Sequence, residues 1–448
     1  MANELIKKDL QYIWHPCSQM HDYETFPPLI IKKAYGPYLE LANGKKIIDA
    51  ISSWWCKNLG HGNVRLKTAL LQQAEKFEHV IFANTTNETI VSLAENLTHL
   101  TPGLDKIFFA SEGSSAVEIA IKLSLHSRQI TGERSRRGVM ALQNSYHGET
   151  LLALSLSDVK LYRKPYENIL TPCDFLQNIP YVCSKSVPIW ENCALHWPEI
   201  EKQLEKHAAT LSAIIVEPIV QGAAGMLIYS KDFLQRLRYW ATQHKVHLIV
   251  DEIMTGFWRT GMPFAYQYAK IEPDIICMGK GLTAGWLPMS AVLTTHAIYE
   301  LFYADYAENK AFLHSHTFSG NALAARVSLE ALKIYQEENI EAQVKNKELL
   351  LRNLMLDVAA KTQRLTNVRN IGAIVAADLI LDREKQHQRI GYQVFQEAIK
   401  LGAYLRPLGN TIYWLPPLNI EEDVLFELQK ITIQAINKAM KNWCNSLS

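Results

Sequence analysis

The chain contains several short runs of apolar, largely β-branched residues, each bounded by polar or turn-forming residues. Such runs are typical of strands that are buried within a parallel sheet. They lie at residues 106–110, 139–142, 213–216, 246–250 and 275–278. The pattern predicts an α/β protein with an open sheet, in which ligands bind at the carboxyl ends of the strands.

Other patterns predict helices and turns in the rest of the chain. The Asn43-Gly44 pair inside residues 38–49 predicts a β-hairpin. Residues 160–200 hold many Pro, Cys, Trp and Asn residues, and we predict an irregular excursion there. Helices are predicted at residues 64–77, 88–99, 113–129, 322–338 and 340–361. Strands that indicate a small α+β domain are predicted near residues 373–381 and 411–415.

Two successive apolar runs end on residues that can carry chemistry. The first leads into Asp251 and Glu252, and the second delivers Lys280 between Gly279 and Gly281. A lysine held among apolar groups loses its charge readily and can form a Schiff base with an aldehyde. A carboxylate beside it can keep a pyridine nitrogen protonated, and glycines let the backbone approach a flat ring. Each residue alone is explained by a surface loop or a helix cap, but the combination indicates pyridoxal phosphate (PLP) chemistry.

The sequence VDEIMTGFWRTG, followed by GKGLTAGWLP, resembles the class III (ω-amino) aminotransferases of PLP fold type I. The resemblance extends over nearly the whole chain. It implies a large domain with a mixed, mostly parallel sheet flanked by helices, and a smaller α+β domain built from both terminal segments. We therefore expect residues 1–60 to pack with the small domain, residues 61–335 to form the large PLP-binding domain, and residues 336–448 to form the small domain.

The resemblance also implies which residues bind pyridoxal 5'-phosphate. Lys280 would carry the cofactor, and Asp251 would contact its ring nitrogen. Gly113 and Ser114 would bind the phosphate, because free backbone N–H groups and a helix dipole suit an anion. An aromatic ring from the Asn-Ser-Tyr-His-Gly motif would lie on the face of the cofactor, which points to Tyr146.

Further positions are implied by the same resemblance. Glu217, in VEPIVQGAAGM, would join a hydrogen-bond network near the cofactor rather than carry the proton. In HSHTFSGN, Thr317 would reach the phosphate bound by the partner subunit of a homodimer with shared active sites. Ser315 and His316 would line the same loop. Arg259 is expected to be a structural or subunit-contact charge.

Three stretches resemble the members of this family that act in biotin synthesis. They are Ile13-Trp14-His15-Pro16, Ser52-Ser53-Trp54-Trp55, and Leu405-Arg406-Pro407 with the following IYWLPP. The substrate of those members is a long keto acid with an amine and a terminal carboxylate. Apolar walls from Trp54 and Trp55 suit its methylenes, and the planar guanidinium of Arg406 suits its carboxylate.

We therefore expect a PLP-dependent transaminase that converts 8-amino-7-oxononanoate to 7,8-diaminononanoate. Lys280 would form the Schiff base and then move the α-proton as general base and acid, with ping-pong kinetics. Trp54 and Trp55 favour S-adenosylmethionine as the amine donor. Lysine is the alternative donor, because Cys17 stands where relatives carry an aromatic residue and Ser315-His316 where they more often carry Gly-Pro.

Two other functions remain as alternatives. One is a general ω-amino acid:pyruvate aminotransferase, which would accept short donors such as β-alanine. The other is a PLP-binding regulatory protein without catalysis, but such proteins usually add a DNA-binding module for which this chain has no spare length.

The composition of the chain limits the partners and the cellular location that we expect. The 448 residues suffice for two domains, and the net charge of +1, from 46 basic and 45 acidic residues, includes no long basic block. We expect small-molecule substrates and neither nucleic acid nor a membrane as partner. Seven cysteines without a CxxC pair, and charges in the N-terminal MANELIKKDLQ, indicate a cytoplasmic protein. No metal is expected, because Cys173, Cys183 and Cys193 with His196 match no common zinc spacing.

Overall fold

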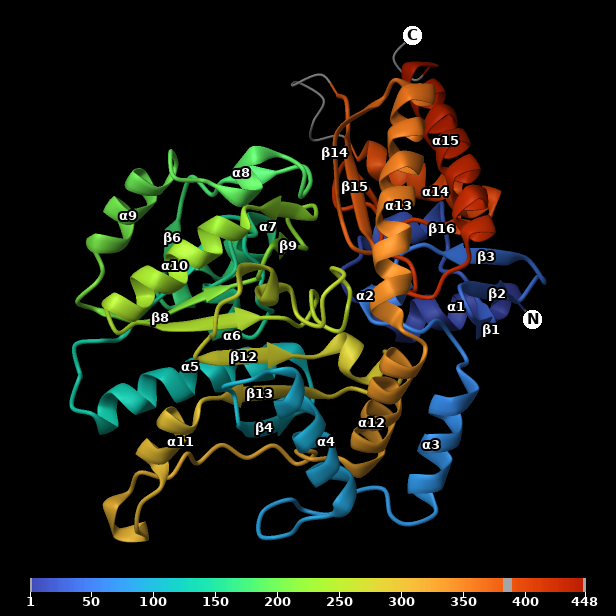
Figure 1. Ribbon diagram of the computed structural model, residues 1–448. Coiled ribbons are helices and arrows are strands. Elements are labelled where there is room, and N and C mark those ends of the chain that lie inside the picture. Colours follow the sequence, from blue (N-terminus) through green and yellow to red (C-terminus); the bar gives the residue numbers. More distant parts are fainter. Residues whose placement is uncertain (1, 382–388, 446–448) are drawn as a thin grey trace.

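The computed structural model describes residues 2–381 and 389–445, and its largest element is a seven-stranded sheet (Figure 1). In spatial order its strands are β4 (Lys106–Ala110), β13 (Ser290–Thr294), β12 (Ile275–Met278), β11 (His247–Asp251), β8 (Leu211–Val216), β5 (Gly138–Leu142) and β6 (Asp174–Leu176). Within this sheet β13 alone is antiparallel to its neighbours β12 and β4, and the other pairs are parallel. The mixed, mostly parallel sheet expected from the sequence is confirmed.

The central strands form where the apolar runs predicted them. Every residue of β8 and β12 is buried, as is every residue of β11 except His247. Helices cover the sheet, so side chains on both faces leave water, which is the main favourable contribution to folding. The longer helices of this part are α5 (Gly113–Ile130), α10 (Lys231–Gln243), α12 (Ala322–Glu337), α3 (Val64–Ala74) and α4 (Glu88–Leu100).

The pairing of β11 with β12 brings the two reactive positions to one edge of the sheet. The strands are parallel and in register, with Asp251 opposite Cys277. Lys280 begins a short 3₁₀ turn, Lys280–Thr283, just past the end of β12. Both residues therefore lie at the carboxyl edge, where open α/β sheets bind ligands.

The C-terminal part has its own core and includes an N-terminal sheet. Its three-stranded sheet, β14 (Leu365–Ile371), β15 (Ile374–Leu379) and β17 (Thr411–Trp414), packs with the helices α13 (Ile340–Thr362), α14 (Ile390–Leu401) and α15 (Glu422–Asn445). The strands β1 (Ile31–Tyr35), β2 (Tyr38–Leu41) and β3 (Lys46–Asp49) continue into β16 (Ala403–Tyr404). The predicted hairpin at 38–49 is confirmed, and β3 joins the C-terminal part through β16. The predicted division into residues 1–60, 61–335 and 336–448 stays a prediction.

The prediction of an irregular excursion at residues 160–200 was wrong. This stretch contains short helices, and β6 extends the main sheet at its edge. A three-residue strand is too short to show a hydrophobic period, so no pattern in the sequence predicts β6. The elements are α7 (Lys160–Arg163), β6, β7 (Tyr181–Val182), α8 (Pro188–Glu191) and α9 (Trp197–Glu205).

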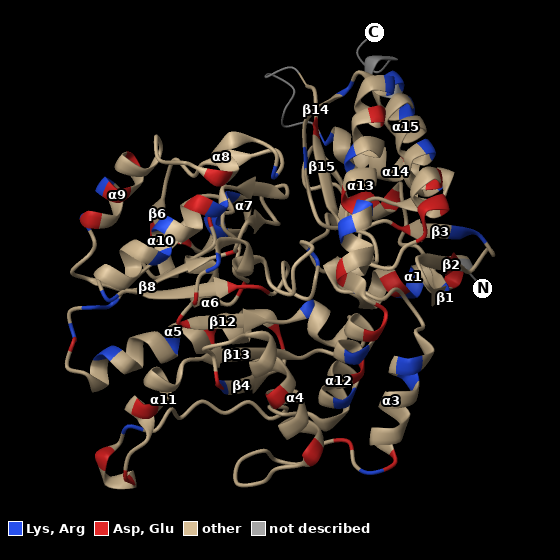
Figure 2. Cartoon of the chain, in the orientation of Figure 1, with Lys and Arg blue, Asp and Glu red and all other residues tan. Residues whose placement is uncertain are grey.

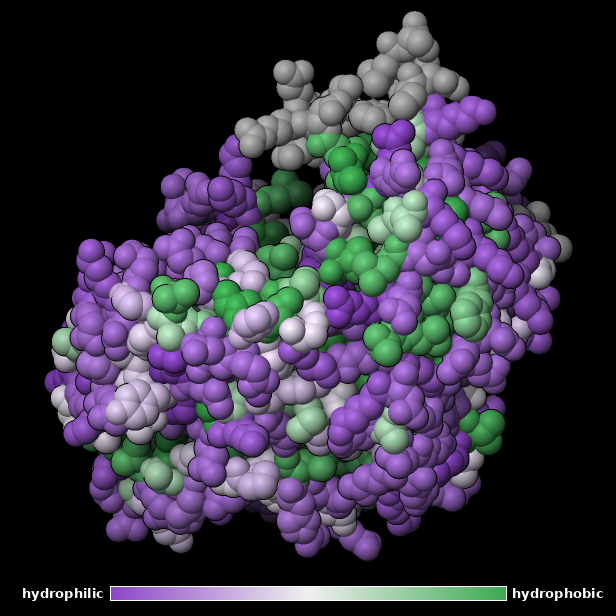
Figure 3. All heavy atoms as spheres, turned by 45° about the horizontal axis from the view of Figure 1, so that its top comes forward, coloured by the Kyte–Doolittle hydropathy of each residue, from purple (hydrophilic) through white to green (hydrophobic). Residues whose placement is uncertain are grey.

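The remaining elements are short or lie at the periphery. They are α1 (Ala2–Tyr12), α2 (Ser52–Trp55), α6 (Leu151–Ser155), β9 (Val220–Gln221), β10 (Leu227–Tyr229) and α11 (His296–Phe302). Acidic and basic residues are interspersed along the helices (Figure 2). The face shown in Figure 3 is mostly hydrophilic, with hydrophobic residues gathered between the part that carries the large sheet and the C-terminal part. No helix within residues 2–381 and 389–445 combines the length and apolar character that crossing a membrane requires.

Candidate active site

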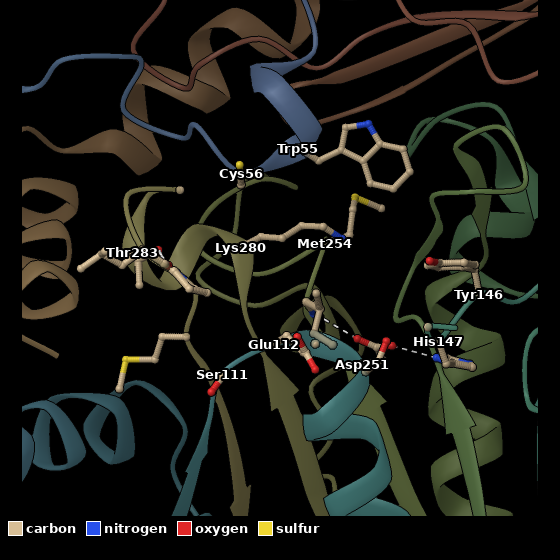
Figure 4. Close-up of a pocket in the computed structure, with 18 of the residues that line it drawn as sticks. Trp55, Cys56, Ser111, Glu112, Tyr146, His147, Asp251, Met254, Lys280 and Thr283 are labelled. Carbon is tan, nitrogen blue, oxygen red and sulfur yellow. Dashed lines mark hydrogen bonds and ion pairs between the residues drawn. The ribbon is translucent and has the colours of Figure 1, made fainter. Parts of the chain in front are cut away.

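A cavity of about 430 Å³ opens at the carboxyl edge of the main sheet. It lies between the start of α5, the ends of β11 and β12, and the segment that follows α2 (Figure 4). Its volume falls within the range of about 300–1,000 Å³ that small-molecule sites occupy. Seven residues predicted from the sequence line it: Trp55, Gly113, Ser114, Tyr146, Glu217, Asp251 and Lys280.

Lys280 extends across the middle of this cavity, below Trp55 in Figure 4. Its Nζ lies 5.1 Å from the centre of a Trp55 ring. Burial lowers the pKa of Lys280, and the negative charges of Asp251 and Glu217 partly offset that effect. A lysine in this setting reaches its neutral, nucleophilic form more readily than one in water.

Asp251 is held by a histidine to which the sequence analysis gave no role. The carboxylate is buried, and its Oδ2 accepts a hydrogen bond of 2.8 Å from Nδ1 of His147. Its Oδ1 accepts a bond from the backbone N–H of Ile253. The Nε2 atom of His147 is buried and has no hydrogen-bond partner among the residues that the structure describes. The pair fixes the orientation of the Asp251 carboxylate toward the cavity.

The side chain of Glu252, next to Asp251 at the end of β11, is buried in the core rather than in the cavity. It is fully buried, and its two oxygens accept hydrogen bonds from the Thr255 hydroxyl and the Tyr266 backbone N–H. Burial raises its pKa to about 7. Although the sequence places two carboxylates at this strand end, only Asp251 lines the cavity.

Glu217 and Tyr146 form a second polar contact inside the cavity. Glu217 accepts backbone N–H bonds of 2.9 Å from Tyr146 and from Gly222. Burial raises the pKa of Glu217 to about 7, and the nearby His147 opposes this shift. The Tyr146 hydroxyl donates to Glu149. Glu217 thus lies in a hydrogen-bond network, as the sequence analysis expected.

The start of α5 offers the cavity the backbone of Gly113 and Ser114 together with Ser111 and Glu112. Gly148 approaches this turn so closely that a Cβ there would collide with the Ser114 side chain. Ile253 packs against the same turn, 3.0 Å from where a Cβ on Gly113 would lie. An 18-residue helix whose first N–H groups face the cavity suits a phosphate. Lysine, oriented carboxylate and phosphate-binding turn together fit pyridoxal phosphate.

Several predicted residues lie outside the cavity. Trp54 is 43% exposed, and the Arg406 guanidinium stacks on its ring at 4.3 Å. Ser315, His316 and Thr317 do not line the cavity either. His316 Nε2 lies 2.9 Å from Nε2 of His314, and the Thr317 carbonyl contacts His79. The predicted binding roles of these five residues stay predictions.

Cys17, the departure from the family pattern, is connected through Tyr162 to Tyr146, which lines the cavity. Its thiol is 2.8 Å from the Tyr162 hydroxyl, and the Tyr162 ring meets the Tyr146 ring edge to face at 6.3 Å. Cys17 therefore contacts an aromatic residue from α7, in the stretch that was predicted to be irregular.

The sequence analysis did not identify some of the lining residues. They include His147, Ile253, Met254, Cys56, Thr283 and Trp286. His147 directly follows Tyr146 in the Asn-Ser-Tyr-His-Gly motif, so the sequence could have indicated that it lies near the site. The apolar members carry no chemical signature of their own, and only the fold reveals them.

Comparison with known proteins gives consistent matches. Residues 19–436 match the sequence profile of the family described as Aminotransferase class-III. An adenosylmethionine-8-amino-7-oxononanoate aminotransferase of Helicobacter pylori is 40% identical over 419 residues, which cover 93% of each chain. The crystal structure of a protein of the same name from Methanocaldococcus jannaschii superimposes with a TM-score of 0.90 at 32% identity, covering 98% of this chain and 99% of that one. An omega transaminase from Pseudomonas jessenii, solved in complex with PMP, gives a TM-score of 0.89 at 25% identity over 98% of both chains.

Proposed function

This chain belongs to the class-III aminotransferases, and from that premise we propose that it aminates 8-amino-7-oxononanoate to 7,8-diaminononanoate in biotin synthesis. It is a PLP-dependent enzyme, as members of this class are. The observation that carries the choice of substrate is the 40% identity over 93% of both chains to the Helicobacter pylori protein named for this substrate. The Trp54-Trp55 pair and Arg406 support it chemically.

Each part of the cofactor has a matching group in the cavity. Gly113 and Ser114 would bind the phosphate at the start of α5, Asp251 would bind the ring nitrogen, and Tyr146 would cover the ring. Glu217 would hold Tyr146 in place through its backbone N–H. When bound, PLP supplies an aldehyde that takes up the amino group and a ring that accepts electrons.

The protein's own contribution to the reaction centres on proton transfer. Lys280, whose pKa is lowered, accepts the α-proton at Nζ in one step and gives it back in a later step. It therefore acts as both general base and general acid. Asp251 would contact the ring nitrogen and so favour the protonated ring. His147 holds Asp251 in that orientation through the 2.8 Å bond. Trp55 lines the cavity on the side of Lys280 that is uppermost in Figure 4.

The two substrates would use one site in turn. Trp54 and Trp55 would wall the methylenes of the keto acid, and Arg406 would bind its carboxylate. We propose S-adenosylmethionine as the amine donor, because the relatives with this fold and 32–40% identity carry it in their names. Binding one substrate after the other at a single site predicts ping-pong kinetics.

The cellular location and the oligomeric state are also part of the proposal. Seven cysteines without a CxxC pair support a cytoplasmic location. The loop Ser315-His316-Thr317 lies outside the cavity of its own chain, which supports its predicted role in a homodimer with shared active sites.

The test is a steady-state assay of 7,8-diaminononanoate formation by the PLP-loaded enzyme, with S-adenosylmethionine or lysine as donor. Lys280→Ala should abolish turnover, whereas Lys270→Ala, which removes an exposed lysine from the same region, should leave it unchanged. Product formation with lysine but not with S-adenosylmethionine would reassign the donor. Retained turnover in Lys280→Ala would remove the basis of the mechanism.

A further inference from the structure

A second polar cluster lies on the side of the Lys280 loop that faces away from the cavity. It consists of Asn58, Arg259 and Tyr335, which come from three distant parts of the chain. Their exposed fractions are 1%, 0% and 1%. None of the three lines the cavity, so none is accounted for by substrate or cofactor binding.

The backbone that this cluster contacts is the one that carries Lys280. Lys280 has φ +41°, in the left-handed region that is unfavourable for a residue with a side chain. The Tyr335 hydroxyl donates a 2.8 Å hydrogen bond to the carbonyl of the next residue, Gly281. A Cβ on Gly281 would lie 2.6 Å from Nδ2 of Asn58, so the loop is packed directly against that amide.

Arg259 and Asn58 connect this loop to the rest of the fold. Arg259 donates to the Asn58 side-chain oxygen at 2.9 Å and to the Pro416 carbonyl at 2.6 Å. It forms no ion pair with any residue that the structure describes, and burial lowers its pKa to about 9. The Asn58 amide donates to the Phe257 carbonyl, and the Asn58 carbonyl accepts from Leu418 N–H. Asn58 therefore joins the N-terminal segment, the motif after β11 and the C-terminal segment.

We propose that Tyr335 and Asn58 are positioning residues, which hold the Lys280 backbone in its left-handed conformation and so aim the amine at the reacting atoms. A strained backbone persists only where its surroundings determine it. The Tyr335 hydroxyl and the Asn58 amide are the side-chain polar groups that contact Gly281, and neither touches the reacting atoms. This proposal rests on the proposed role of Lys280. It adds that residues outside the cavity fix the orientation of this lysine.

The consequence for Lys280 has a definite direction. Its pKa is lowered because the loop keeps the amine among buried groups. A loosened loop gives Nζ more freedom to reach water, and water favours its protonated form, whether Nζ is the free amine or the Schiff-base nitrogen that the visible absorbance of the PLP-loaded enzyme would report. The charged or titratable groups that act on it are Asp251 at the end of β11, Cys56 after α2 and Glu217 after β8. A change at Tyr335 alters none of these groups directly.

The experiment compares two single hydroxyl deletions in the PLP-loaded enzyme. Tyr335→Phe removes the bond to Gly281 but keeps a ring that packs against Trp258 and Phe257. Tyr268→Phe is the matched control, since its hydroxyl donates a bond of the same 2.8 Å length to the Thr260 carbonyl. Both should lower stability by a similar amount, as read from thermal unfolding.

Only Tyr335→Phe should act on the active site. We expect the pH midpoint of the cofactor's visible absorbance to rise by about half a unit, and kcat to fall about fivefold, with KM nearly unchanged. Asn58→Ala should shift the same midpoint in the same direction. An unshifted midpoint in Tyr335→Phe, or equal shifts in both tyrosine variants, would overturn the proposal. Failure of the mechanism itself would be seen separately, as turnover retained by Lys280→Ala.

Discussion

The two sides of the Lys280 loop are built from different chemistry. The cavity side carries Asp251 and Glu217, two buried carboxylates, with His147 beside them. The buried side carries Arg259, whose partners are an amide oxygen and a backbone carbonyl rather than a carboxylate. Negative groups thus face the lysine amine, while the cation behind the loop is held by neutral acceptors.

The two sides of the loop therefore differ in role: the cavity side is suited to binding a ligand, and the buried side to supporting the backbone of the loop. On the cavity side, Nε2 of His147 lacks a partner among the described residues, and the pKa values of Glu217 and Lys280 are shifted, as is common in functional sites. On the buried side, uncharged acceptors bind Arg259 without adding a negative charge that would compete with Asp251 for Lys280. The first side is arranged for a ligand, and the second for a fixed backbone.

The largest expected effect comes from removing charge on the cavity side. Asp251→Asn keeps the shape of the side chain but loses its negative charge, so turnover should fall by about 100- to 1,000-fold. Binding of PLP, followed by absorbance, should persist through the remaining contacts. Turnover within tenfold of the unchanged enzyme would contradict the role given to Asp251.

On the buried side, the main loss should be in stability. Asn58→Ala leaves Arg259 short of one acceptor and the Phe257 carbonyl without its donor, which should cost about 2–4 kcal/mol of unfolding free energy. Denaturant unfolding measures it, with the exposed Asn192→Ala as control. A loss no larger than that of the control would show that the cluster contributes little to the fold.

Glu252 lies next to Asp251 but is buried in the core, and its contribution to the free energy of unfolding should depend on pH. Because burial raises its pKa from 4.5 to about 7, the folded state binds a proton that the unfolded state releases. Its contribution to stability is therefore full below about pH 4.5 and is lost as the pH rises through 7. Glu252→Gln, which stays neutral, should reduce that loss by about 2 kcal/mol.

The measurement for Glu252 is the free energy of unfolding of both proteins at pH 5 and pH 8. The difference between them should favour the variant more at pH 8 than at pH 5. The exposed Glu95→Gln is the control and should show no such change. Parallel pH profiles for Glu252→Gln and the unchanged protein would argue against a raised pKa.

The smallest effect is expected at Trp54, which lies outside the cavity. Trp54→Leu removes the ring on which Arg406 stacks, an exposed cation–π contact worth about 0.5–1 kcal/mol. KM for the keto acid should rise about two- to fivefold, with kcat unchanged. An unchanged KM would mean that Arg406 needs no support from Trp54.

The cavity side was largely predictable from the sequence, because most of its polar residues lie in short, recognisable sequence patterns. Continuous apolar runs located β11 and β12, and the residues directly after them were Asp251 and Lys280. The Asn43-Gly44 pair located the hairpin. The Gly/Ser turn predicted the start of α5, which lines the cavity.

The buried side could not be predicted, because no local pattern encodes it. Asn58, Arg259 and Tyr335 meet only when three segments pack together, and the hydrogen bond between Arg259 and Asn58 alone spans 201 positions along the chain. Arg259 was expected to be a structural or subunit-contact charge, and its observed hydrogen bonds are structural ones within the chain. The pairing of His147 with Asp251 spans 104 positions and likewise depends on the order of the strands.

The most direct test of the central claim is a titration of the PLP-loaded protein, followed by absorbance, with single amines. We expect 7,8-diaminononanoate and S-adenosylmethionine each to convert the spectrum from the pyridoxal to the pyridoxamine form, while β-alanine and 4-aminobutyrate leave it unchanged. Conversion by the two short amines, with no response to the diamine, would contradict the proposed substrate and indicate a general ω-amino acid aminotransferase.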